Sequence, residues 1–424
     1  MTAIPRKLLS ANASVDPDGH LLVAGLDVLD LANEFGTPLF VYDEDDIRDR
    51  ARAAVAAFGD GVAYASKAFL CKAMARLAHE EGMCIDVSTA GEMHVALASG
   101  VPADRLVLHG NNKSEAELAR ALDVGVGRIV VDSFDEMDRL GDLLKERPDL
   151  RPRVLVRVTP GIEAHTHEYV MTGQEDSKFG FSLASGAAAD AIARLATMPV
   201  DLVGLHSHIG SQIFMTAGFE QEVVILADLV KATGVEELCI GGGLGVAYMP
   251  NEEGPTIAQW GATVKAAARR VGIDAAVHIT AEPGRAIVGP TALTLYRVGT
   301  IKELAGIRTY VAVDGGMSDN PRPVLYGSGY DTFLPRCVDA DRDWTVTLVG
   351  KHCESGDVIV RDARVPIDMG VGDIIATPVT GAYGYSMASN YNKVTRPAVV
   401  FVRDGVARVV VRRETLDDLL RLDQ

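Results

Sequence analysis

Short apolar runs rich in β-branched residues recur along the first two thirds of the chain, and stretches with apolar residues spaced three and four apart separate most of them. The runs predict eight strands: Val62–Ser66, Cys84–Val87, Arg105–Leu108, Arg128–Val131, Val154–Val158, Leu202–His206, Leu238–Ile240 and Val277–Ala281. The intervening stretches predict helices such as Phe69–Glu81, Ala90–Ser99, Ser114–Leu122, Phe134–Lys145 and Ile257–Arg270. This alternation over roughly 240 residues is typical of an α/β protein with a (β/α)8 TIM-type barrel.

A doubly wound open sheet would produce the same alternation and is the competing interpretation. The glycine run at 241–245 does not complete the GxGxxG spacing of dinucleotide-binding sheets, and no Walker lysine is present. We therefore favour the barrel.

Beyond residue 290 the sequence becomes dense in strand patterns and poor in helical ones, which predicts a C-terminal all-β domain of sandwich or barrel-like form. The predicted strands are Thr294–Ile301, Thr309–Val313, Trp344–Gly350, Val358–Val360, Asp373–Val379 and the hairpin of Ala398–Val402 with Ala407–Val411. Two early segments, Leu21–Val23 and Leu39–Tyr42, are expected to join this domain. The predicted division is thus a barrel over residues 43–290 and a β domain formed by residues 1–42 and 291–424.

The composition restricts the possible partners. The chain of 424 residues carries a net charge of -17 and has no basic run, so we expect no nucleic acid partner. No apolar stretch is long enough for a signal peptide or a bilayer span, which predicts a cytoplasmic protein without a membrane partner. The five cysteines lack CxxC spacing and fit a reducing compartment; Cys84 and Cys239 are expected in the core.

Polar residues gather where the predicted barrel strands end, which is where barrel enzymes place their active sites. These residues are Lys67, Asp86, His109, Asp132, Arg157, His206, His208, Glu282 and Arg285. Each of them alone could be a structural residue, but the joint pattern indicates a site. A lysine at such a position can form a Schiff base with a carbonyl compound.

The glycines at 241–243 follow the seventh predicted strand, and glycine lets backbone N–H groups approach a phosphate closely. The loops after strands seven and eight are a recurrent phosphate site in barrels, although a tight turn would use the same residues. Pyridoxal phosphate is a phosphorylated cofactor that condenses with lysine, and it needs a group that keeps its pyridine nitrogen protonated. Glu282 is positioned to supply that group.

Nine segments in order resemble the motifs of the diaminopimelate decarboxylases, a family of the alanine-racemase-like, fold type III pyridoxal phosphate enzymes. They are Tyr64–Ala68, Ser177–Phe181, His208–Gln212, Gly241–Gly243, Glu282–Arg285, Asp314–Met317, Arg322–Tyr326, Cys353–Asp357 and Gly381–Tyr383. The resemblance covers nearly the whole chain and implies a homodimer whose active sites are shared between subunits.

The same resemblance implies the role of each matching residue. Lys67 would hold pyridoxal 5'-phosphate, and Cys353 of the partner subunit would return a proton to the substrate carbon. Further cofactor contacts would come from Asp86, His208, Ser211, Gly242, Gly243, Glu282 and Tyr383. Substrate contacts would come from Arg285, Arg322, Tyr326, Glu354 and Tyr383. Cys353 could otherwise be an ordinary buried thiol.

The implied reaction is decarboxylation of meso-2,6-diaminopimelate at its D centre to L-lysine and carbon dioxide, the last step of lysine biosynthesis. This substrate has a second amino acid group at its far end, so its pocket needs a cation for the distal carboxylate and an acid for the distal ammonium. Arg322 and Glu354 meet that need, although an Arg-Pro pair could also lie in a surface loop.

Three alternatives remain open at this point. The chain could decarboxylate another basic amino acid, such as lysine, ornithine or arginine. It could be an amino acid racemase, but those enzymes present an arginine to the pyridine nitrogen, and Glu282 argues against that. It could also be a non-catalytic cofactor carrier.

One further pattern suggests a metal site. His165 and His167 resemble a metal-binding pair, but no third ligand has suitable spacing. We expect no metal, and we expect the segment from His165 to Lys178 to cover the barrel mouth.

Overall fold

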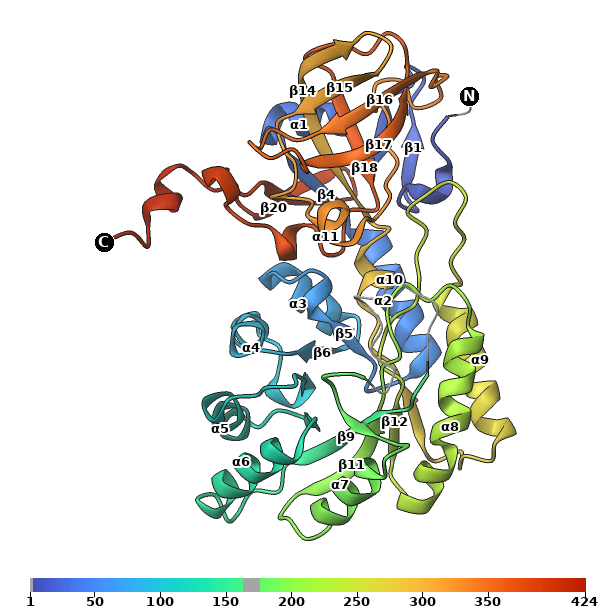
Figure 1. Cartoon of the computed structure of the whole chain (residues 1–424), viewed down its shortest axis with the longest axis vertical. Coiled ribbons are helices and arrows are strands. Elements are labelled where there is room, and N and C mark those ends of the chain that lie inside the picture. The colour runs from blue at the N-terminus through green and yellow to red at the C-terminus, as the bar shows by residue number, and fades with distance from the viewer. Residues whose placement is uncertain (1–2, 163–175) are drawn as a thin grey trace. The chain divides into compact units, whose positions relative to one another are not determined.

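The computed structural model describes residues 3–162 and 176–424 (Figure 1). Within them the chain forms two compact units, which we describe separately. The barrel unit comprises Arg50–Gly245 and Gly254–Ala286. The β unit comprises Met1–Asp49, Val246–Glu253 and Ile287–Gln424. The predicted domain boundaries at residues 43 and 290 stay a prediction.

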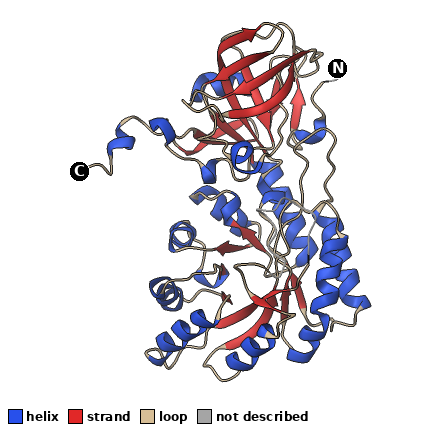
Figure 2. Ribbon diagram, in the orientation of Figure 1, coloured by secondary structure: helices blue, strands red, loops and turns tan. Residues whose placement is uncertain are grey.

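All eight predicted barrel strands are present, and they form one parallel sheet (Figure 2). In sheet order they are β5 (Ala63–Ala65), β6 (Cys84–Val87), β7 (Leu106–Leu108), β8 (Arg128–Val131), β9 (Arg153–Thr159), β11 (Asp201–His206), β12 (Glu237–Cys239) and β13 (His278–Thr280). A short strand, β10 (Phe181–Ser182), pairs with β9 outside this order.

Backbone hydrogen bonds join the first barrel strand to the end of the last one. The amide of Ala63 donates to the carbonyl of Ala281 at 3.0 Å, and that of Ala65 donates to Pro283 at 3.2 Å. These bonds bring the two edges of the sheet together, so the barrel is confirmed and the doubly wound sheet is wrong.

Helices follow the barrel strands and pack outside them (Figure 1). Their bounds are α3 (Lys72–Glu80), α4 (Ala90–Ala98), α5 (Glu115–Val124), α6 (Phe134–Lys145), α7 (Ala187–Leu195), α8 (Ala217–Thr233), α9 (Ile257–Arg270) and the single turn α10 (Arg285–Val288). The helix α2 (Glu44–Phe58) begins in the β unit and ends in the barrel unit. The predicted bounds of α6 and α9 match those observed. The predicted start of α3 was three residues early, because Phe69 and Cys71 are extended.

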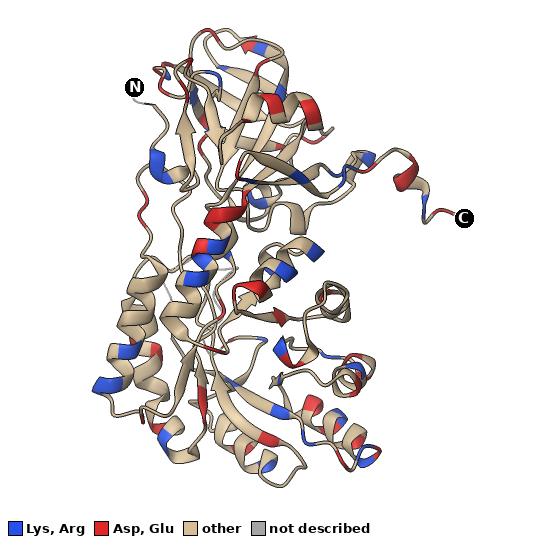
Figure 3. Ribbon diagram, turned by 180° about the vertical axis from the view of Figure 1, so that it is seen from behind, with Lys and Arg blue, Asp and Glu red and all other residues tan. Residues whose placement is uncertain are grey.

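Local sequence signals explain where several helices begin. Ser114 and Glu117 form a capping box at the start of α5, and Thr256 and Gln259 form another at the start of α9. Each box satisfies two backbone N–H groups that the first helical turn leaves without partners. Acidic and basic residues are interspersed along the helices of the barrel unit (Figure 3).

A cluster of buried side chains drawn from seven of the eight barrel strands forms a continuous core layer: Ala63, Cys84, Val107, Val130, Leu155, Val203 and Cys239. Cys84 and Cys239 are each 3% exposed, which confirms that they are core residues. All five cysteines are free thiols.

The β unit contains the strand-dense sequence after residue 290, so the predicted all-β region is confirmed. Its main sheet has the order β17 (Val358–Val365), β16 (Trp344–Val349), β15 (Arg308–Val313), β14 (Ala292–Leu304), β4 (Leu39–Asp43), β19 (Ala398–Arg403) and β20 (Val406–Val411). One more strand, β18 (Ile374–Pro378), also pairs with β14. Two short helices, α1 (Val28–Phe35) and α11 (Arg322–Tyr326), belong to the same unit.

The two early segments are both strands of the β unit, but they pair in different sheets. The segment Leu39–Tyr42 joins the main sheet as β4, between β14 and β19. The segment Leu21–Val23, as β2, instead forms a separate antiparallel sheet with β1 (Ala13–Val15) and β3 (Leu26–Asp27). Its neighbours in sequence are therefore its partners, and like Leu39–Tyr42 it belongs to the β unit, as expected.

The predicted hairpin of β19 and β20 is present, and its turn residues Asp404 and Gly405 have φ values of 50° and 70°. A two-residue hairpin turn with positive φ at both positions matches the twist of the strands it joins. Among the helices that the structure describes, none is both long and apolar enough to cross a bilayer.

Candidate active site

Lys67 lies directly after β5 in the short 3-10 helix Ser66–Ala68, and its side chain is exposed. The segment that carries it packs closely on the segment after β13. A Cβ atom at Gly284 would lie 2.9 Å from the Ala65 carbonyl oxygen and 3.1 Å from the Ala68 Cβ. Only glycine permits this approach, which brings the Lys67 segment beside the one that carries Glu282 and Arg285.

Glu282 is the centre of a buried hydrogen-bond cluster. Its Oε1 is 2.8 Å from His109 Nε2, and its Oε2 is 2.9 Å from His206 Nε2. The carboxylate is 7% exposed, and the two imidazole rings meet edge to face at 4.9 Å. Asp86 lies at the edge of this cluster, with Oδ1 3.8 Å from His109 Nε2. Strands β6, β7, β11 and β13 thus bring these four residues together.

Electrostatics makes Glu282 the anion of the cluster. Burial opposes its ionisation, but the nearby His109 and His206 outweigh burial and hold the pKa of Glu282 well below its usual value. Burial lowers the pKa of His206 to about 4, so at neutral pH its ring is uncharged and donates a hydrogen bond to Glu282. A buried ionised carboxylate is therefore available at the carboxyl end of the barrel.

The pKa of Asp86 is shifted in the opposite direction to that of Glu282. Burial raises its pKa to about 6, and the Glu282 charge acts in the same direction, while His109 and Lys67 favour the ionised form. Lys67 is thus close enough to influence this carboxyl group. Burial lowers the pKa of His208, and the charge of Lys67 acts in the same direction. The Lys67 charge thus acts on both Asp86 and His208, and the close packing at Gly284 brings the Lys67 segment beside that of Glu282.

His109, His206 and Glu282 also have the composition of a metal site, since their ligand atoms lie within 4.8 Å of one another. Their N···O distances of 2.8 and 2.9 Å are those of hydrogen bonds. Two ligands of one tetrahedral zinc, each about 2.1 Å from the metal, lie farther apart than this. The observed spacing therefore fits a hydrogen-bonded carboxylate.

A second group of residues extends the site along β8 and β9. Arg157 Nη1 is 3.8 Å from Asp132 Oδ2, and its guanidinium lies 4.3 Å from the centre of the Phe179 ring. The Gly180 amide donates to Asp132 Oδ1 at 3.0 Å. A Cβ atom at Gly180 would lie 2.8 Å from the Arg157 carbonyl oxygen, so this glycine allows the Ser177–Phe181 motif to pack at the end of the strands.

The glycine run after β12 packs tightly between two neighbouring loops. A Cβ atom would lie 2.4 Å from the Glu282 carbonyl oxygen at Gly242 and 2.2 Å from the Gly210 carbonyl oxygen at Gly243. The Gly242 amide donates to His208 Nδ1 at 3.1 Å, which leaves the proton of a neutral His208 ring on Nε2. The glycine run thus fixes the orientation of the His208 ring.

Arg285 joins the next loop to this arrangement, because its Nη2 donates to Ser211 Oγ at 3.1 Å. Ser211 follows the His208 segment, and Arg285 follows the Glu282 segment. The barrel unit therefore brings together Lys67, Asp86, His208, Ser211, Gly242, Gly243, Glu282 and Arg285.

The other predicted site residues, Arg322, Tyr326, Cys353, Glu354 and Tyr383, lie in the β unit. Arg322 is 4% exposed. Its Nη1 donates to the Tyr330 hydroxyl at 2.6 Å, and its Nη2 donates to Ser328 Oγ at 3.1 Å. Its guanidinium also lies 4.2 Å from the centre of the Tyr248 ring.

The contacts of Arg322 are unusual for a buried cation. Among residues 3–162 and 176–424, no carboxylate lies within 4.0 Å of its guanidinium, although buried arginines are normally paired with an acid. The hydroxyl groups and the aromatic face orient this guanidinium without neutralising it. An Arg-Pro pair in a surface loop, the alternative interpretation, does not fit this burial.

Cys353 and Glu354 are both exposed in a short loop, so Cys353 is not an ordinary buried thiol. The Cys353 amide donates to Asn392 Oδ1 at 2.9 Å. Asp357 closes the loop, because its Oδ2 accepts from the His352 amide at 2.9 Å and lies 2.7 Å from His352 Nδ1. The backbone around Cys353 is therefore well fixed.

Tyr383 has a positive φ of 60°, which is uncommon for a residue with a side chain. Nearby, the Gly381 carbonyl accepts from the Tyr42 hydroxyl at 2.8 Å. A Cβ atom at Gly381 would lie 1.8 Å from the Val288 carbonyl oxygen, so the turn before Tyr383 requires glycine.

Sequence reasoning placed His109 and His206 at strand ends but gave them no role, and the structure shows that they hold Glu282. It did not find Tyr248 and Tyr330, the aromatic neighbours of Arg322. The role of the two histidines could have been inferred from their positions, because the ends of strands three and six face the same mouth of the barrel as Glu282. The prediction about His165 and His167 lies outside the described residues.

The geometry of the barrel end fits pyridoxal phosphate. Lys67 supplies an amine, Glu282 supplies a buried anion for a protonated pyridine nitrogen, and the glycine run lets backbone groups approach a phosphate. Fold and site together define a barrel-type pyridoxal phosphate enzyme.

Comparison with known proteins gives the family. The family model for the pyridoxal-dependent decarboxylase, pyridoxal binding domain, matches residues 44–289. The diaminopimelate decarboxylase of Mycobacterium tuberculosis is 50% identical over 433 residues, covering 97% of this chain and 96% of its own. That of Bacillus subtilis is 47% identical over 425 residues, covering 96% and 95%.

Among solved structures, a diaminopimelate decarboxylase from M. jannaschii in complex with L-lysine is similar, with a TM-score of 0.90 and 31% identity over 98% of each chain. The chain belongs to the diaminopimelate decarboxylase family and is a pyridoxal phosphate-dependent decarboxylase.

Proposed function

We propose that this protein removes carbon dioxide from the D centre of meso-2,6-diaminopimelate and forms L-lysine, the last step of lysine biosynthesis. The names of relatives at 50% and 47% identity support this assignment. The observation that carries it is the buried Arg322 guanidinium without a carboxylate partner among the described residues. A substrate with a second carboxylate would supply that partner.

In this proposal residues 43–290 form the cofactor-binding barrel, which the family match over residues 44–289 supports. Pyridoxal phosphate, when bound, supplies a conjugated ring that withdraws the electrons left by the departing carbon dioxide. Lys67 holds the aldehyde end of the cofactor through its amine. Glu282 would accept a hydrogen bond from the pyridine nitrogen and keep it protonated, because a nearby anion favours the charged ring.

The remaining barrel residues position the cofactor. His208 would contact the ring face, and its hydrogen bond with Gly242 fixes the orientation of the imidazole. Ser211, Gly242 and Gly243 bind the phosphate. Asp86 belongs to the polar shell of the cofactor, beside His109.

Substrate selection is assigned to Arg285 and to the β unit. Arg322 binds the distal carboxylate and Glu354 binds the distal ammonium, while Tyr326 contributes a hydroxyl. Tyr383 contacts both cofactor and substrate. An arginine offers several N–H donors in a fixed plane, which suits a carboxylate.

Cys353 donates a proton to the substrate carbon after carbon dioxide leaves. We propose that Cys353 does so from the partner subunit of a homodimer. The adjacent Glu354 would bind the substrate from the same subunit. The Cys353 thiol is exposed and its backbone is fixed, which supports a role in contact with another subunit. The five cysteines without CxxC spacing support a cytoplasmic location.

The test is a carbon dioxide release assay with added pyridoxal phosphate and four substrates: meso-diaminopimelate, L-lysine, L-ornithine and L-arginine. We expect the highest kcat/KM with meso-diaminopimelate. Higher activity with one of the other three would show that the protein decarboxylates another basic amino acid. Cofactor binding without carbon dioxide release from any of them would show a non-catalytic carrier.

A further inference from the structure

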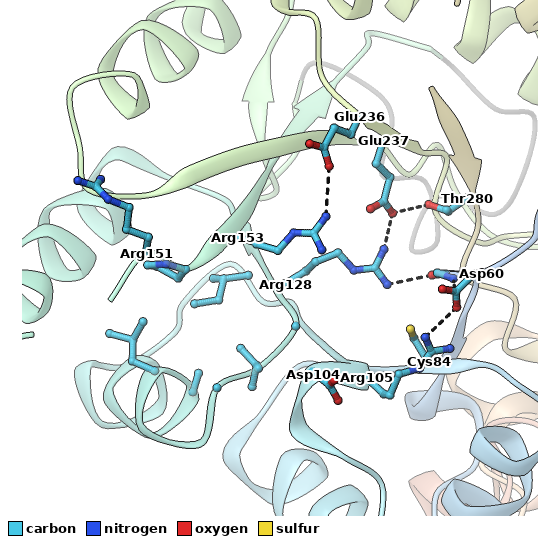
Figure 4. Close-up of a pocket in the computed structure, with 18 of the residues that line it drawn as sticks. Asp60, Cys84, Asp104, Arg105, Arg128, Arg151, Arg153, Glu236, Glu237 and Thr280 are labelled. Atoms are coloured by element: carbon cyan, nitrogen blue, oxygen red, sulfur yellow. Dashed lines mark hydrogen bonds and ion pairs between the residues drawn. The ribbon is translucent and has the colours of Figure 1, made fainter. Parts of the chain in front are cut away.

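A cavity of about 580 Å³, drawn in Figure 4, is lined by residues of the barrel unit. Residues that begin strands line it, namely Cys84, Arg128, Arg153, Glu237 and His278. The active-site residues instead follow or end the strands. Because all these strands are parallel, their first residues face one mouth of the barrel and their last residues face the other. The cavity is therefore a separate site, and its size suits a small molecule.

The floor of the cavity is a hydrogen-bonded polar network. Arg128 Nη1 donates to Glu237 Oε1 at 2.5 Å, and Thr280 Oγ1 donates to the same oxygen at 2.6 Å. Arg128 Nη2 donates to the Gly61 carbonyl at 2.9 Å. Arg128 is 9% exposed and Glu237 is 7% exposed, so this pair is buried and satisfied. It supports the cavity and is not available to a ligand.

Arg105, a second arginine of the floor, is also paired within the protein. Arg105 Nη1 donates to Asp60 Oδ1 at 2.7 Å, and its Nη2 donates to the Gly82 carbonyl at 2.8 Å. Burial opposes the charge of Arg105, but the interaction with Asp60 outweighs burial and raises the pKa of Arg105. This guanidinium therefore also belongs to the wall.

The rim differs from the floor. Arg153 Nη2 lies 3.4 Å from Glu236 Oε2, and the two side chains are 54% and 71% exposed. Such a long, exposed ion pair contributes little and can open without a large loss. Arg151 lies two residues before Arg153, is also exposed, and lines the same cavity. Figure 4 shows the rim residues Arg151, Arg153 and Glu236 above the buried Arg128.

One wall of the cavity is apolar, formed by Leu122, Val126, Ile129, Leu150 and Pro152. Leu150 is 36% exposed, which is high for a leucine beside a cavity. An apolar wall beside a few oriented charged groups is the usual construction of a small-molecule site.

We propose that this cavity binds a free α-amino acid with an apolar side chain. Its carboxylate pairs with Arg151 and Arg153, its ammonium pairs with Glu236, and its side chain covers Leu122 and Leu150. Because the floor groups already pair with one another, the exposed rim residues Arg151, Arg153 and Glu236 select the ligand, and a ligand with both charges is favoured over a simple anion or cation. This site is additional to the proposed reaction and does not depend on it.

The experiment titrates the full-length, pyridoxal phosphate-loaded protein with L-leucine by ligand-observed NMR. Two half-molecules are titrated in parallel: 4-methylpentanoate, which lacks the amine, and 3-methylbutylamine, which lacks the carboxylate. We expect saturable binding of L-leucine, and binding at least about tenfold weaker for each half-molecule, because each leaves one rim charge without its partner.

The variants Arg153→Ala and Glu236→Ala should each weaken L-leucine binding by about tenfold or more. The matched control is Arg270→Ala. Arg270 is 58% exposed and pairs with Glu220 at 2.5 Å, but it does not line the cavity, so its loss should leave leucine binding unchanged. Lys67→Ala should also leave it unchanged, which distinguishes the cavity from the active site.

Several results would overturn this inference. One is the absence of saturable L-leucine binding at about 10 mM. Another is equal affinity in wild type, Arg153→Ala and Glu236→Ala. A loss of leucine binding in Lys67→Ala would assign the amino acid to the active site, and an equal loss in Arg270→Ala would show a general charge effect.

Discussion

Replacing Glu282 by glutamine removes the charge at the centre of the candidate active site and nearly preserves the size of the side chain. The two carboxylate oxygens lie 2.8 Å from His109 Nε2 and 2.9 Å from His206 Nε2. The proposed function requires this carboxylate to face the pyridine nitrogen of the cofactor and to stabilise its protonated form. The amide in the Glu282→Gln variant carries no charge for that purpose.

The magnitude follows from the burial of the site. Two unit charges about 3 Å apart interact by about 5 kcal/mol at an effective dielectric constant of about 20. Removing one preorganised electrostatic group from an active site costs about 10²- to 10³-fold in kcat, or about 3 to 4 kcal/mol. The neighbouring His206, with a pKa of about 4, is neutral at pH 7 and cannot replace the lost charge.

The assay has two measurements at pH 7: kcat for carbon dioxide release from meso-diaminopimelate, and the visible absorption of the lysine-bound cofactor. We expect kcat to fall by about 10²- to 10³-fold. The absorption should remain, because Lys67 holds the other end of the cofactor. A fall of less than about threefold with the cofactor fully bound would refute the assigned role of Glu282.

Glu222→Gln is the matched control. Glu222 on α8 is 0% exposed, and burial raises its pKa to about 8. Its carboxyl group is therefore mostly protonated at pH 7, so replacing it by an amide changes little charge. The variant should retain kcat close to that of the wild type.

Three further predictions concern other residues. Lys67→Ala should abolish both carbon dioxide release and the visible absorption of the bound cofactor, with little change in Tm because Lys67 is exposed; absorption spectra and thermal unfolding measure these effects. Arg322→Ala should lower kcat/KM for meso-diaminopimelate by about 10²- to 10³-fold, because the distal carboxylate loses a buried cation worth about 3 to 4 kcal/mol, whereas residual activity on L-lysine should change far less. Glu222→Gln should become more stable relative to the wild type as pH rises, and denaturant unfolding at several pH values measures this. The usual glutamate pKa of 4.5 is raised to about 8 in the folded protein, so the folded state keeps a proton that the unfolded state loses. Between these values the wild type loses about 1.4 kcal/mol of stability per pH unit from this group, and the Glu222→Gln variant avoids that loss.

Each of these predictions has a contradicting result. Persistence of the cofactor absorption in Lys67→Ala would show that another lysine holds the cofactor. Equal losses on both substrates in Arg322→Ala would refute the distal carboxylate pocket; Arg308→Ala is its control, because Arg308 lies over Tyr310 at 5.7 Å and is exposed. A stability difference between wild type and Glu222→Gln that does not change with pH would show that Glu222 ionises normally in the fold.

The barrel could be predicted because its pattern is local. Each strand is a short apolar run, and each helix has its own periodicity and, in α5 and α9, its own capping box. Strand partners are not local. Leu21–Val23 was correctly predicted to be a strand, but its sequence does not show whether it pairs with its neighbours or with the main sheet, and it pairs with β1 and β3.

The candidate site shows the same limit. The positions of Lys67 and Glu282 at strand ends follow from the strand prediction, and so do those of His109 and His206. Their hydrogen bonds depend on side-chain distances that no spacing rule gives. Tyr248 was still harder to find, because it belongs to the segment Val246–Glu253, which lies between two barrel elements in sequence but is part of the β unit beside Arg322.

Glu222 and Glu282 show why residue type alone does not define a site. Both are buried glutamates in the barrel unit, and burial acts to raise the pKa of each. Glu282 has two imidazole donors and stays ionised, whereas the Glu222 carboxyl oxygens have no hydrogen-bond partner among the described residues, and this group stays protonated at neutral pH. To stabilise a protonated pyridine ring, a buried carboxylate has to keep its negative charge without contact with water. Hydrogen-bond donors held by other strands allow it to do so. The two histidines therefore support the charge that the proposed chemistry requires, and loss of either one should raise the pKa of Glu282.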